Sequence, residues 1–332
     1  MNTENPRKPL IRRFSTAPMM DWSDSHCRFF WRQLSRQALL YTEMVTTGAL
    51  IHGNRERFLQ YHDIEHPIAL QLGGSNPDEL ARCARFAQDW GYDEVNLNVG
   101  CPSDRVQNNM IGACLMGHPQ LVADCVKAMR DSCDIPVTVK HRIGIDDQDG
   151  YEHMRDFVAT VAEAGCEVFI VHARKAILQG LSPKENREVP PLKYDYVYRL
   201  KQELPQLEIL LNGGLKTHDE SLQCLQHLDG VMIGREAYQN PGILLDVDTL
   251  YFENADAAPK PPASKADVIR RLYPYIEEQL GKGATLHHIS RHTLGLFNAQ
   301  KGARLYRRHL SENAHKKGAG PEVMEQALAF VE

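Results

Sequence analysis

Eight short apolar segments recur along the first 233 residues, and their spacing limits the possible fold more than any other feature. Most are continuously apolar rather than alternating, a pattern typical of strands that are covered on both faces. Most intervals between them are long enough for a helix, so strands and helices are predicted to alternate. The expected strands are Phe14–Met19, Leu39–Met44, Ile68–Leu72, Glu94–Val99, Val137–Arg142, Val168–His172, Ile209–Asn212 and Gly230–Ile233.

Amphipathic helical patterns fill the intervals. Asn76 is followed by proline and two acids, a typical helix start, and Leu80, Cys83, Ala84 and Ala87 form the expected buried stripe. Eight strand–helix units in ~250 residues predict an α/β fold, the (β/α)8 TIM barrel. The alternative is an open doubly wound sheet, which has fewer strands and usually a Gly-x-Gly-x-x-Gly turn that this chain lacks. Further helices are expected near 119–131, 151–164, 192–203 and 217–226.

A smaller unit is expected after the barrel. The segment 257–262 holds three prolines in its last four residues and cannot continue a helix, so it predicts a linker. We therefore expect a barrel domain over 1–256, a linker over 257–263 and a small helical bundle over 264–332. Ser264 opens its first helix, Pro274 is expected to kink that helix, and further helices are expected at 285–298, 302–316 and 321–331.

Charge is distributed unevenly along the chain. The formal net charge is −5, but residues 262–332 hold 11 Lys and Arg against 7 Asp and Glu, a balance of +4, which leaves −9 on residues 1–261. A basic bundle on an acidic body suggests a contact with a polyanion. A solvated helix face explains the same run equally well.

The cysteines and the lack of long apolar segments point to a soluble cytoplasmic protein. The eight cysteines include no Cys-x-x-Cys pair, so we expect free thiols in a reducing compartment and no zinc ribbon. No apolar run approaches the roughly 18 residues of a membrane span. His288 and His292 stand four residues apart, but no third ligand accompanies them, so we expect surface or RNA-facing histidines and no metal site.

Small and polar residues gather at the carboxyl ends of the expected strands, where TIM barrels place their active sites. Gly213-Gly214 and Gly234-Arg235 follow strands seven and eight, the usual phosphate site of such barrels, although ordinary tight turns would also use these glycines. A phosphate there and a planar group against the segment 17–19 would describe FMN, with Lys140 stabilising negative charge on the reduced ring. The expected cofactor residues are Ala17, Pro18, Met19, Gln71, Lys140, His172, Asn212, Gly213, Gly214, Gly234 and Arg235.

Cys101 is the expected catalytic residue. It follows the buried strand Glu94–Val99 within Asn-Val-Gly-Cys-Pro-Ser, so a rigid element would place its thiol beside the cleft. Many free cysteines are simply small buried hydrophobes, and that is the alternative for this one.

Several motifs together resemble the tRNA-dihydrouridine synthases. They are Ala17-Pro-Met, Asn96-Leu-Asn-Val-Gly-Cys-Pro-Ser103, Thr138-Val-Lys140, His172-Ala-Arg-Lys175, Asn212-Gly-Gly and Gly234-Arg-Glu-Ala-Tyr-Gln-Asn-Pro241. The run 181–191, together with 291–297 and 311–315, extends the resemblance over nearly the whole chain, and 181–191 is similar to the A-type subfamily.

The resemblance implies an FMN enzyme that uses NADPH to reduce the C5–C6 double bond of uridine in tRNA, at D-loop positions 20 and 20a. Cys101 would then donate a proton to uracil C5 as a neutral thiol. Asn98 would bond the uracil edge, and Arg174 would bind the flavin or substrate. The resemblance further implies that Lys184, Arg187, Arg304 and Arg307 orient the tRNA, whose target base must be extruded into the pocket.

Three other readings remain open from the sequence. A flavin barrel acting on a free pyrimidine-like molecule would use the same lysine and glycines. A non-catalytic RNA-binding protein would keep the barrel only as a scaffold. A lyase would form a Schiff base on Lys140. The lack of a dinucleotide fingerprint does not exclude NADPH, which can enter the cleft above the flavin transiently.

Overall fold

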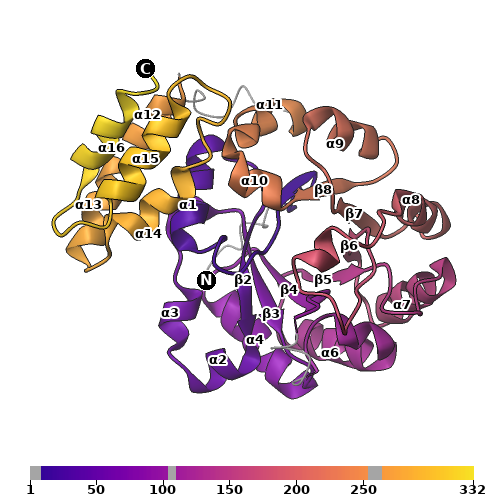
Figure 1. Cartoon of the computed structure of the whole chain (residues 1–332). Helices are drawn as coiled ribbons and strands as arrows, with labels where there is room; N and C mark the ends of the chain where they lie inside the picture. The colour runs from indigo at the N-terminus through magenta and orange to yellow at the C-terminus, as the bar shows by residue number, and fades with distance from the viewer. Residues whose placement is uncertain (1–8, 104–109, 253–263) are drawn as a thin grey trace.

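The computed structural model describes residues 9–103, 110–252 and 264–332. Eight parallel strands form one sheet in the order β1-β8-β7-β6-β5-β4-β3-β2, surrounded by helices (Figure 1). The predicted TIM barrel is confirmed. The strands are β1 (Phe14–Thr16), β2 (Leu40–Thr46), β3 (Ile68–Gly73), β4 (Glu94–Val99), β5 (Val137–Arg142), β6 (Val168–His172), β7 (Glu208–Asn212) and β8 (Gly230–Ile233).

β1 closes the sheet because it forms hydrogen bonds on both sides. On one side Phe14 pairs with Val231 of β8. On the other side the amide of Thr16 donates to the carbonyl of Leu39 at 3.0 Å, and the amide of Leu39 donates to the carbonyl of Phe14 at 3.1 Å. Closure leaves neither β1 nor β2 as an open edge.

Four expected strands have different bounds in the structure: β3 and β7 are each one residue longer, and β1 and β2 differ more. β1 ends at Thr16 rather than Met19, because Pro18 has no amide hydrogen with which to continue the ladder. β2 begins at Leu40 and continues to Thr46, past the predicted end at Met44, and its pairing with β3 shifts register on the way. The segment 17–19 therefore follows β1 as a loop.

Helices cover the outer face of the barrel, and α4 illustrates why they form where they do. The side chain of Asn76 accepts hydrogen bonds from two amides of the first turn, and the four predicted stripe residues are all buried. The helical segments are α1 (Ser25–Leu34), α2 (Thr47–His52), α3 (Arg55–Leu59), η1 (Asp63–Glu65), α4 (Pro77–Asp89), η2 (Ala113–Gly117), α6 (Pro119–Ser132), α7 (Tyr151–Glu163), η3 (Glu185–Arg187), α8 (Tyr194–Glu203), α9 (His218–Cys224), α10 (Arg235–Gln239), η4 (Pro241–Asp246) and α11 (Val247–Tyr251).

The carboxyl-terminal helices form the predicted bundle, but the helices expected over 285–298, 302–316 and 321–331 are each shorter than predicted. Ser264 caps the first helix, which breaks before Pro274 as expected. The helix predicted over 285–298 is replaced by α14 and a 3-10 turn that ends at Thr293, and beyond it Gly295 lies so close to the carbonyl of Gln239 that a Cβ there would be 2.2 Å from the oxygen. The elements are α12 (Lys265–Arg270), α13 (Tyr273–Gly281), α14 (Leu286–Ser290), η6 (Arg291–Thr293), α15 (Ala303–Asn313) and α16 (Pro321–Leu328).

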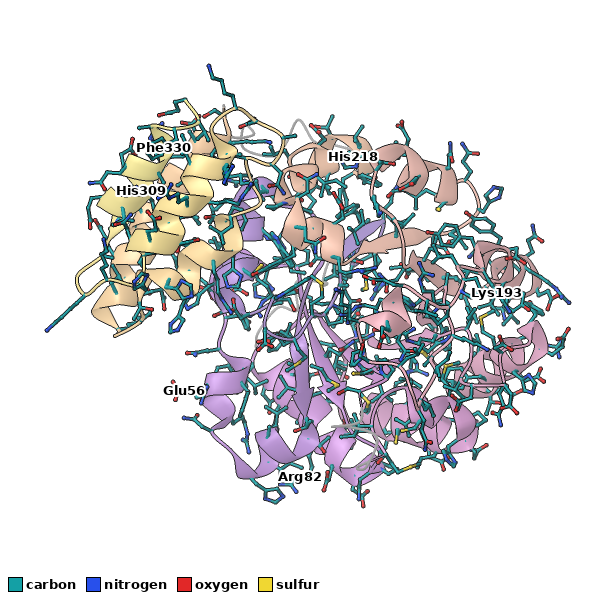
Figure 2. All side chains as sticks on the ribbon, viewed as in Figure 1. Glu56, Arg82, Lys193, His218, His309 and Phe330 are labelled. Carbon is teal, nitrogen blue, oxygen red and sulfur yellow. The ribbon has the colours of Figure 1, made fainter. Side chains whose placement is uncertain are left out.

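The chain end packs back onto this unit. The rings of His309 on α15 and Phe330 after α16 lie 5.9 Å apart (Figure 2). Gly302 has a φ of +85°, and a Cβ there would lie 1.6 Å from the carbonyl oxygen of Phe330. The predicted linker 257–263 falls outside the described residues.

The helical unit packs on α1 through a contact that we call the seam, formed by Asp24, Phe29, Tyr275, Arg291 and His292. The rings of Phe29 and Tyr275 stack with centroids 3.7 Å apart. Asp24 accepts hydrogen bonds from Arg291 at 2.6 Å and from His292 at 3.1 Å. His292 is therefore buried rather than on the surface as expected.

Neither a membrane helix nor a metal cluster appears in the described structure. No helix within the described ranges combines the length and apolar character that a membrane crossing requires. Among the same residues, no group of three or more His, Cys, Asp or Glu side chains is arranged to hold a metal ion.

Candidate active site

The residues expected to bind the cofactor converge at the carboxyl ends of the strands, which we call the rim. Strand register places Asn98 beside Lys140 and His172 beside Asn212. The side chains of Gln71 and Asn98 are hydrogen-bonded across β3 and β4 at 2.8 Å. The barrel thus brings together residues that are far apart in the sequence.

Four hydrogen bonds fix the main chain around Cys101. Asn98 Oδ1 accepts from the amides of Gly100 at 3.0 Å and Cys101 at 2.9 Å. Arg142 Nε donates to the carbonyl of Gly100 at 2.9 Å, and the amide of Ala113 donates to the carbonyl of Cys101 at 2.8 Å. Cys101 is partly exposed, so its thiol is held by a rigid backbone and reachable from outside.

The same bonds revise the expected role of Asn98. Its oxygen holds the loop, and one hydrogen of its Nδ2 bonds Gln71 Oε1. A substrate can therefore meet only the remaining N–H, so the substrate atom has to be an acceptor.

Five basic side chains lie close enough together at the rim for their positive charges to repel one another. They are Lys140, Arg142, Arg174, Arg187 and Arg235. Burial and neighbouring Arg142 lower the pKa of Lys140 to about 7. Burial and neighbouring Arg235 lower the pKa values of Arg174 and Arg187. No carboxylate pairs with Lys140 among the described residues, so the rim holds excess positive charge that suits an anionic ligand.

His172 is neutral and has an unused ring nitrogen. Burial, followed by the charges of Arg142 and Lys140, lowers its pKa well below the usual range. Its buried Nδ1 has no hydrogen-bond partner in the described structure. A ligand at the rim could satisfy that atom, since buried polar atoms are otherwise rarely left unpaired.

Glycines leave space beside these groups. Gly213 and Gly214 have φ values of +109° and +80°, which favour glycine, and a Cβ on Gly213 would lie 3.1 Å from the ring of His172. A Cβ on Gly234 would be 3.4 Å from that of Ala17 and 3.6 Å from Met19 Sδ. With Lys140 and the unpaired nitrogen of His172, this setting fits a planar, phosphorylated cofactor such as FMN.

Arg235 does not stand as a lone cation. Its Nη1 lies 2.8 Å from a carboxylate oxygen of Glu188, and its Nη2 donates to the carbonyl of Arg187 at 3.2 Å. Arg174 contacts the same loop through the carbonyls of Glu188 and Pro190. The loop after β6 is thereby attached to the rim.

Comparison with known proteins decides the family. The model of the dihydrouridine synthase (Dus) family matches residues 15–332. The chain belongs to the dihydrouridine synthase family.

Curated relatives in this family are similar along almost their whole length. The tRNA-dihydrouridine(20/20a) synthase of Yersinia pestis is 62% identical over 328 residues, which cover 98% of this chain and 93% of the relative. The Escherichia coli (strain K12) protein of the same name is 63% identical, covering 96% and 91%. That of Vibrio parahaemolyticus is 61% identical, covering 96% and 97%.

A solved structure supports the fold alone. A 2-naphthoyl-CoA reductase in complex with 2-naphthoyl-CoA superposes with a TM-score of 0.55 at 10% identity, covering 71% of this chain and 49% of that one.

The residues expected to contact tRNA in this family member fall in two places. Arg174 and Arg187 lie at the rim, with Lys184 exposed beside them at the start of η3. Arg304 and Arg307 lie on α15 in the helical unit. These two groups come from different parts of the fold and are not in one cluster.

A short contact path links the second group to the barrel. Arg307 Nη1 donates to Asn298 Oδ1 at 2.8 Å, and Asn298 Nδ2 donates to the carbonyl of Gln239 at 2.5 Å. Gln239 ends α10, the helix that Arg235 begins at the rim. Arg304 is exposed on the same helix as Arg307.

Two residues of the site were missed by sequence reasoning. Arg142 holds Gly100 and also donates to the carbonyls of Lys175 and Asn186, both at 2.9 Å. Gly112 has a φ of +87°, and a Cβ there would lie 2.3 Å from the carbonyl oxygen of Cys101. An arginine at the end of a buried strand was a usable signal for the first, whereas Gly112 had none.

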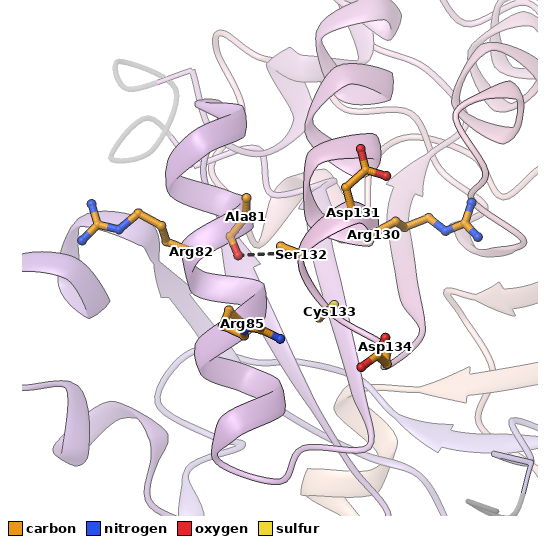
Figure 3. A pocket seen from close by; sticks show the side chains of 8 residues that line it. All are labelled: Ala81, Arg82, Arg85, Arg130, Asp131, Ser132, Cys133 and Asp134. Carbon is orange, nitrogen blue, oxygen red and sulfur yellow. Dashed lines mark hydrogen bonds between the residues drawn. The ribbon is translucent and has the colours of Figure 1, made fainter.

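A surface hollow lies away from the rim. It is formed by α4, the end of α6 and the chain before β5, where Ser132 Oγ donates to the carbonyl of Ala81 at 2.9 Å (Figure 3). Arg82 and Arg130 point away from each other there rather than converging. Because it is at the amino-terminal end of the strands, this hollow is not where a TIM barrel performs chemistry.

Proposed function

We propose that the protein reduces the C5–C6 double bond of uridine in tRNA to 5,6-dihydrouridine at D-loop positions 20 and 20a, with bound FMN and with NADPH as electron donor. The observation that carries this proposal is the partly exposed Cys101 thiol, fixed by four main-chain hydrogen bonds among the cations of the rim. The family match and the relatives' name support the substrate.

Some residues of the rim would bind the cofactor, and Cys101 would act on the uracil base. FMN, when bound, would supply the hydride that uracil C6 receives. Cys101 would hold the proton for C5 on the opposite face of the base. Lys140, once protonated beside an anionic group, would stabilise its negative charge, and the neutral ring of His172 would accept or donate one hydrogen bond.

The remaining cofactor residues would give shape and phosphate contacts. The segment 17–19 and Gly234 lie side by side and would form one wall of the flavin pocket. The positive-φ glycines 213 and 214 would expose amides to the phosphate, with Arg235 adding charge once Glu188 is displaced or shared. Asn212 is held by its bond to the carbonyl of Met232 at 2.8 Å, and Gln71 by its bonds to its neighbours.

The tRNA would be bound by charge and shape across both units. Arg174, Lys184 and Arg187 at the rim would surround the extruded base, while Arg304 and Arg307 would contact phosphates farther along the tRNA. A cytoplasmic setting is part of the proposal, and the eight unpaired cysteines support it.

The test compares Cys101→Ala with Cys114→Ala, which removes the other partly exposed thiol. Unmodified tRNA is incubated with FMN-loaded protein and NADPH, and dihydrouridine is mapped by position. Cys101→Ala should keep FMN and its reduction by NADPH but lose at least about 100-fold in dihydrouridine formation, the usual scale of a lost proton donor. Cys114→Ala should stay within about twofold of the unaltered protein.

Three results would contradict the proposal. One is normal turnover by Cys101→Ala. Another is a colourless protein that binds tRNA without retaining flavin, which would favour the non-catalytic RNA-binding reading. The third is reduction of free uridine at the rate seen with tRNA, which would favour the small-molecule reading.

A further inference from the structure

A continuous chain of side-chain hydrogen bonds runs inside the barrel from its floor to Cys101. Glu94 Oε1 accepts from Thr138 Oγ1 at 2.7 Å, and Thr138 Oγ1 is 2.8 Å from Asn96 Nδ2. Asn96 Oδ1 is 2.8 Å from Gln71 Nε2, and Gln71 Oε1 is 2.8 Å from Asn98 Nδ2. We call Glu94, Thr138, Asn96, Gln71 and Asn98 the ladder. All five are at most 9% exposed, so water does not compete for these bonds.

Glu94 lies at the lower end of the ladder, and its contacts determine which group donates in the first hydrogen bond, the one between Glu94 and Thr138. Arg12 Nε donates to Glu94 Oε2 at 2.6 Å, and arginine has no acceptor atom, so Glu94 meets it as the carboxylate acceptor of an ion pair. An ionised carboxylate only accepts hydrogen bonds. Both hydroxyls at its other oxygen, from Tyr41 at 2.5 Å and Thr138 at 2.7 Å, must therefore donate.

Because Thr138 donates to Glu94, the orientation of every side-chain amide above it in the ladder is determined. Thr138 has used its one hydrogen, so its oxygen must accept from an N–H of Asn96. The oxygen of Asn96 is then left to accept from the amide nitrogen of Gln71. In the same way, the oxygen of Gln71 accepts from the amide nitrogen of Asn98.

The last hydrogen bonds of this series connect Asn98 to the main chain at Gly100 and Cys101. With its nitrogen directed to Gln71, Asn98 presents its oxygen to the amides of Gly100 and Cys101. A reversed amide would set an N–H donor against two N–H donors and release the loop. An amide can be reversed without a change of shape, so shape alone does not hold Asn98 in the required orientation.

We propose that Glu94 sets the orientation of the Asn98 amide through Thr138, Asn96 and Gln71, which makes Thr138 and Asn96 positioning residues for proton delivery by Cys101. The inference rests on the proposed function for the role of Cys101. It goes further by assigning a part in the reaction to residues on the barrel floor that do not reach the rim.

The experiment uses three variants of the full FMN-containing protein. Thr138→Val keeps the shape of the side chain but removes the hydroxyl, so it interrupts the ladder. Thr138→Ser keeps the hydroxyl and loses a methyl group. Tyr41→Phe removes a comparable buried bond to the same oxygen of Glu94 but leaves every bond between ladder residues in place, so it controls for a general loss of stability.

The first measurement is single-turnover uridine reduction after the flavin has been reduced. Thr138→Val should slow this step about tenfold or more, as expected for a misplaced reacting group. Thr138→Ser and Tyr41→Phe should remain within about twofold. The affinity for tRNA should be the same in all four proteins.

The second measurement does not depend on activity. Hydrogen exchange of the backbone amides at 100 and 101, followed by mass spectrometry of a peptide that spans them, should be faster in Thr138→Val than in the other three proteins. Equal exchange in all four proteins, or equal slowing of reduction by Thr138→Val and Tyr41→Phe, would overturn the inference. Faster exchange in Thr138→Val with no dihydrouridine formed by the unaltered protein would overturn the proposed function while supporting the orientation of Asn98.

Discussion

Lys140 has opposite effects on folding and on ligand binding. Its buried positive charge lowers the stability of the folded protein, but the same charge would attract an anionic ligand. Its pKa falls from 10.5 to about 7 in the folded protein, first because of burial and then because of Arg142. The unfolded chain therefore binds more protons between these pH values, and this group alone makes the protein more stable as the pH rises from 7 to 10.5. At pH 7 and below, a charged Lys140 destabilises the flavin-free protein.

Replacing Lys140 should therefore stabilise the protein and impair it together. Lys140→Met should raise the melting temperature of the flavin-free protein by about 3–6 °C at pH 7, with a smaller gain at pH 9.5. The same variant should bind FMN about tenfold more weakly, because an anion loses its nearby cation. Thermal scans at both pH values and a flavin fluorescence titration measure these effects.

Lys127→Met is the matched control, since Lys127 is exposed on α6 and pairs with Asp131. It should change neither the FMN affinity nor, by more than about 1 °C, the melting temperature. A lower melting temperature for Lys140→Met at every pH would show that its charge is compensated in the fold.

At the scale of elements, the sequence predicted what local patterns determine. Continuous apolar runs located all eight strands, and Asn76 with Pro77 located the start of α4. These signals are local, because strand burial and helix caps depend on neighbours in sequence. The positions of Lys140, His172 and Asn212 at the rim followed from the same strands once a barrel was assumed.

The parts that the sequence did not predict depend on distant contacts. One such contact is the approach of Gly295 to the carbonyl of Gln239, 56 positions earlier in the chain, in the region where the helix expected over 285–298 has already ended. The pairing of Arg235 with Glu188 and the hold of Arg142 on Gly100 join segments that are more than 40 residues apart. Local sequence patterns do not predict contacts between residues so far apart in the chain, and these contacts are known only from the folded barrel.

The helix α15 offers a prediction at this scale. Arg304 and Arg307 stand three residues apart on it, a spacing that places both on one side of a helix. Replacing both by alanine should weaken tRNA binding about tenfold or more at 0.1 M salt and lower the salt slope by about two. NADPH oxidation by the bound flavin should be unchanged.

A control with the same loss of charge separates a specific contact from net charge. Lys127 and Arg155 lie on α6 and α7, and each is close to an aspartate. Replacing both by alanine should leave tRNA affinity and its salt slope unaltered. Equal weakening by the two double variants would mean that α15 contributes only to the overall field of the molecule.

At the scale of the whole molecule, the seam fixes the helical unit on α1, and the proposed binding of one tRNA by both the rim and α15 requires that attachment. Burial alone would raise the pKa of Asp24, but its hydrogen bonds from His292, from the amide of Cys27 and from Arg291 lower the pKa well below its usual value. A carboxylate whose pKa is lowered by folding stabilises the protein above the unfolded pKa, and this contribution is lost as the pH falls below about 4.

Asp24→Asn tests this link, because asparagine can still cap α1 while the charge is lost. The variant should lose about 1–3 kcal/mol in urea unfolding at pH 7 and equally at pH 5. Below pH 4 the difference in unfolding free energy between the two proteins should shrink. The carboxyl of Asp24 is protonated first in the unfolded chain, which reduces the stability that the ionised group gives to the folded protein. Hydrogen exchange should increase over 286–293, where Arg291 and His292 lie, while the rim peptides around Cys101 stay protected. Equal stability of the two proteins at pH 7 would show that Phe29 and Tyr275 hold the helical unit without the ion pair, and the orientation of α15 would then rest on apolar packing alone.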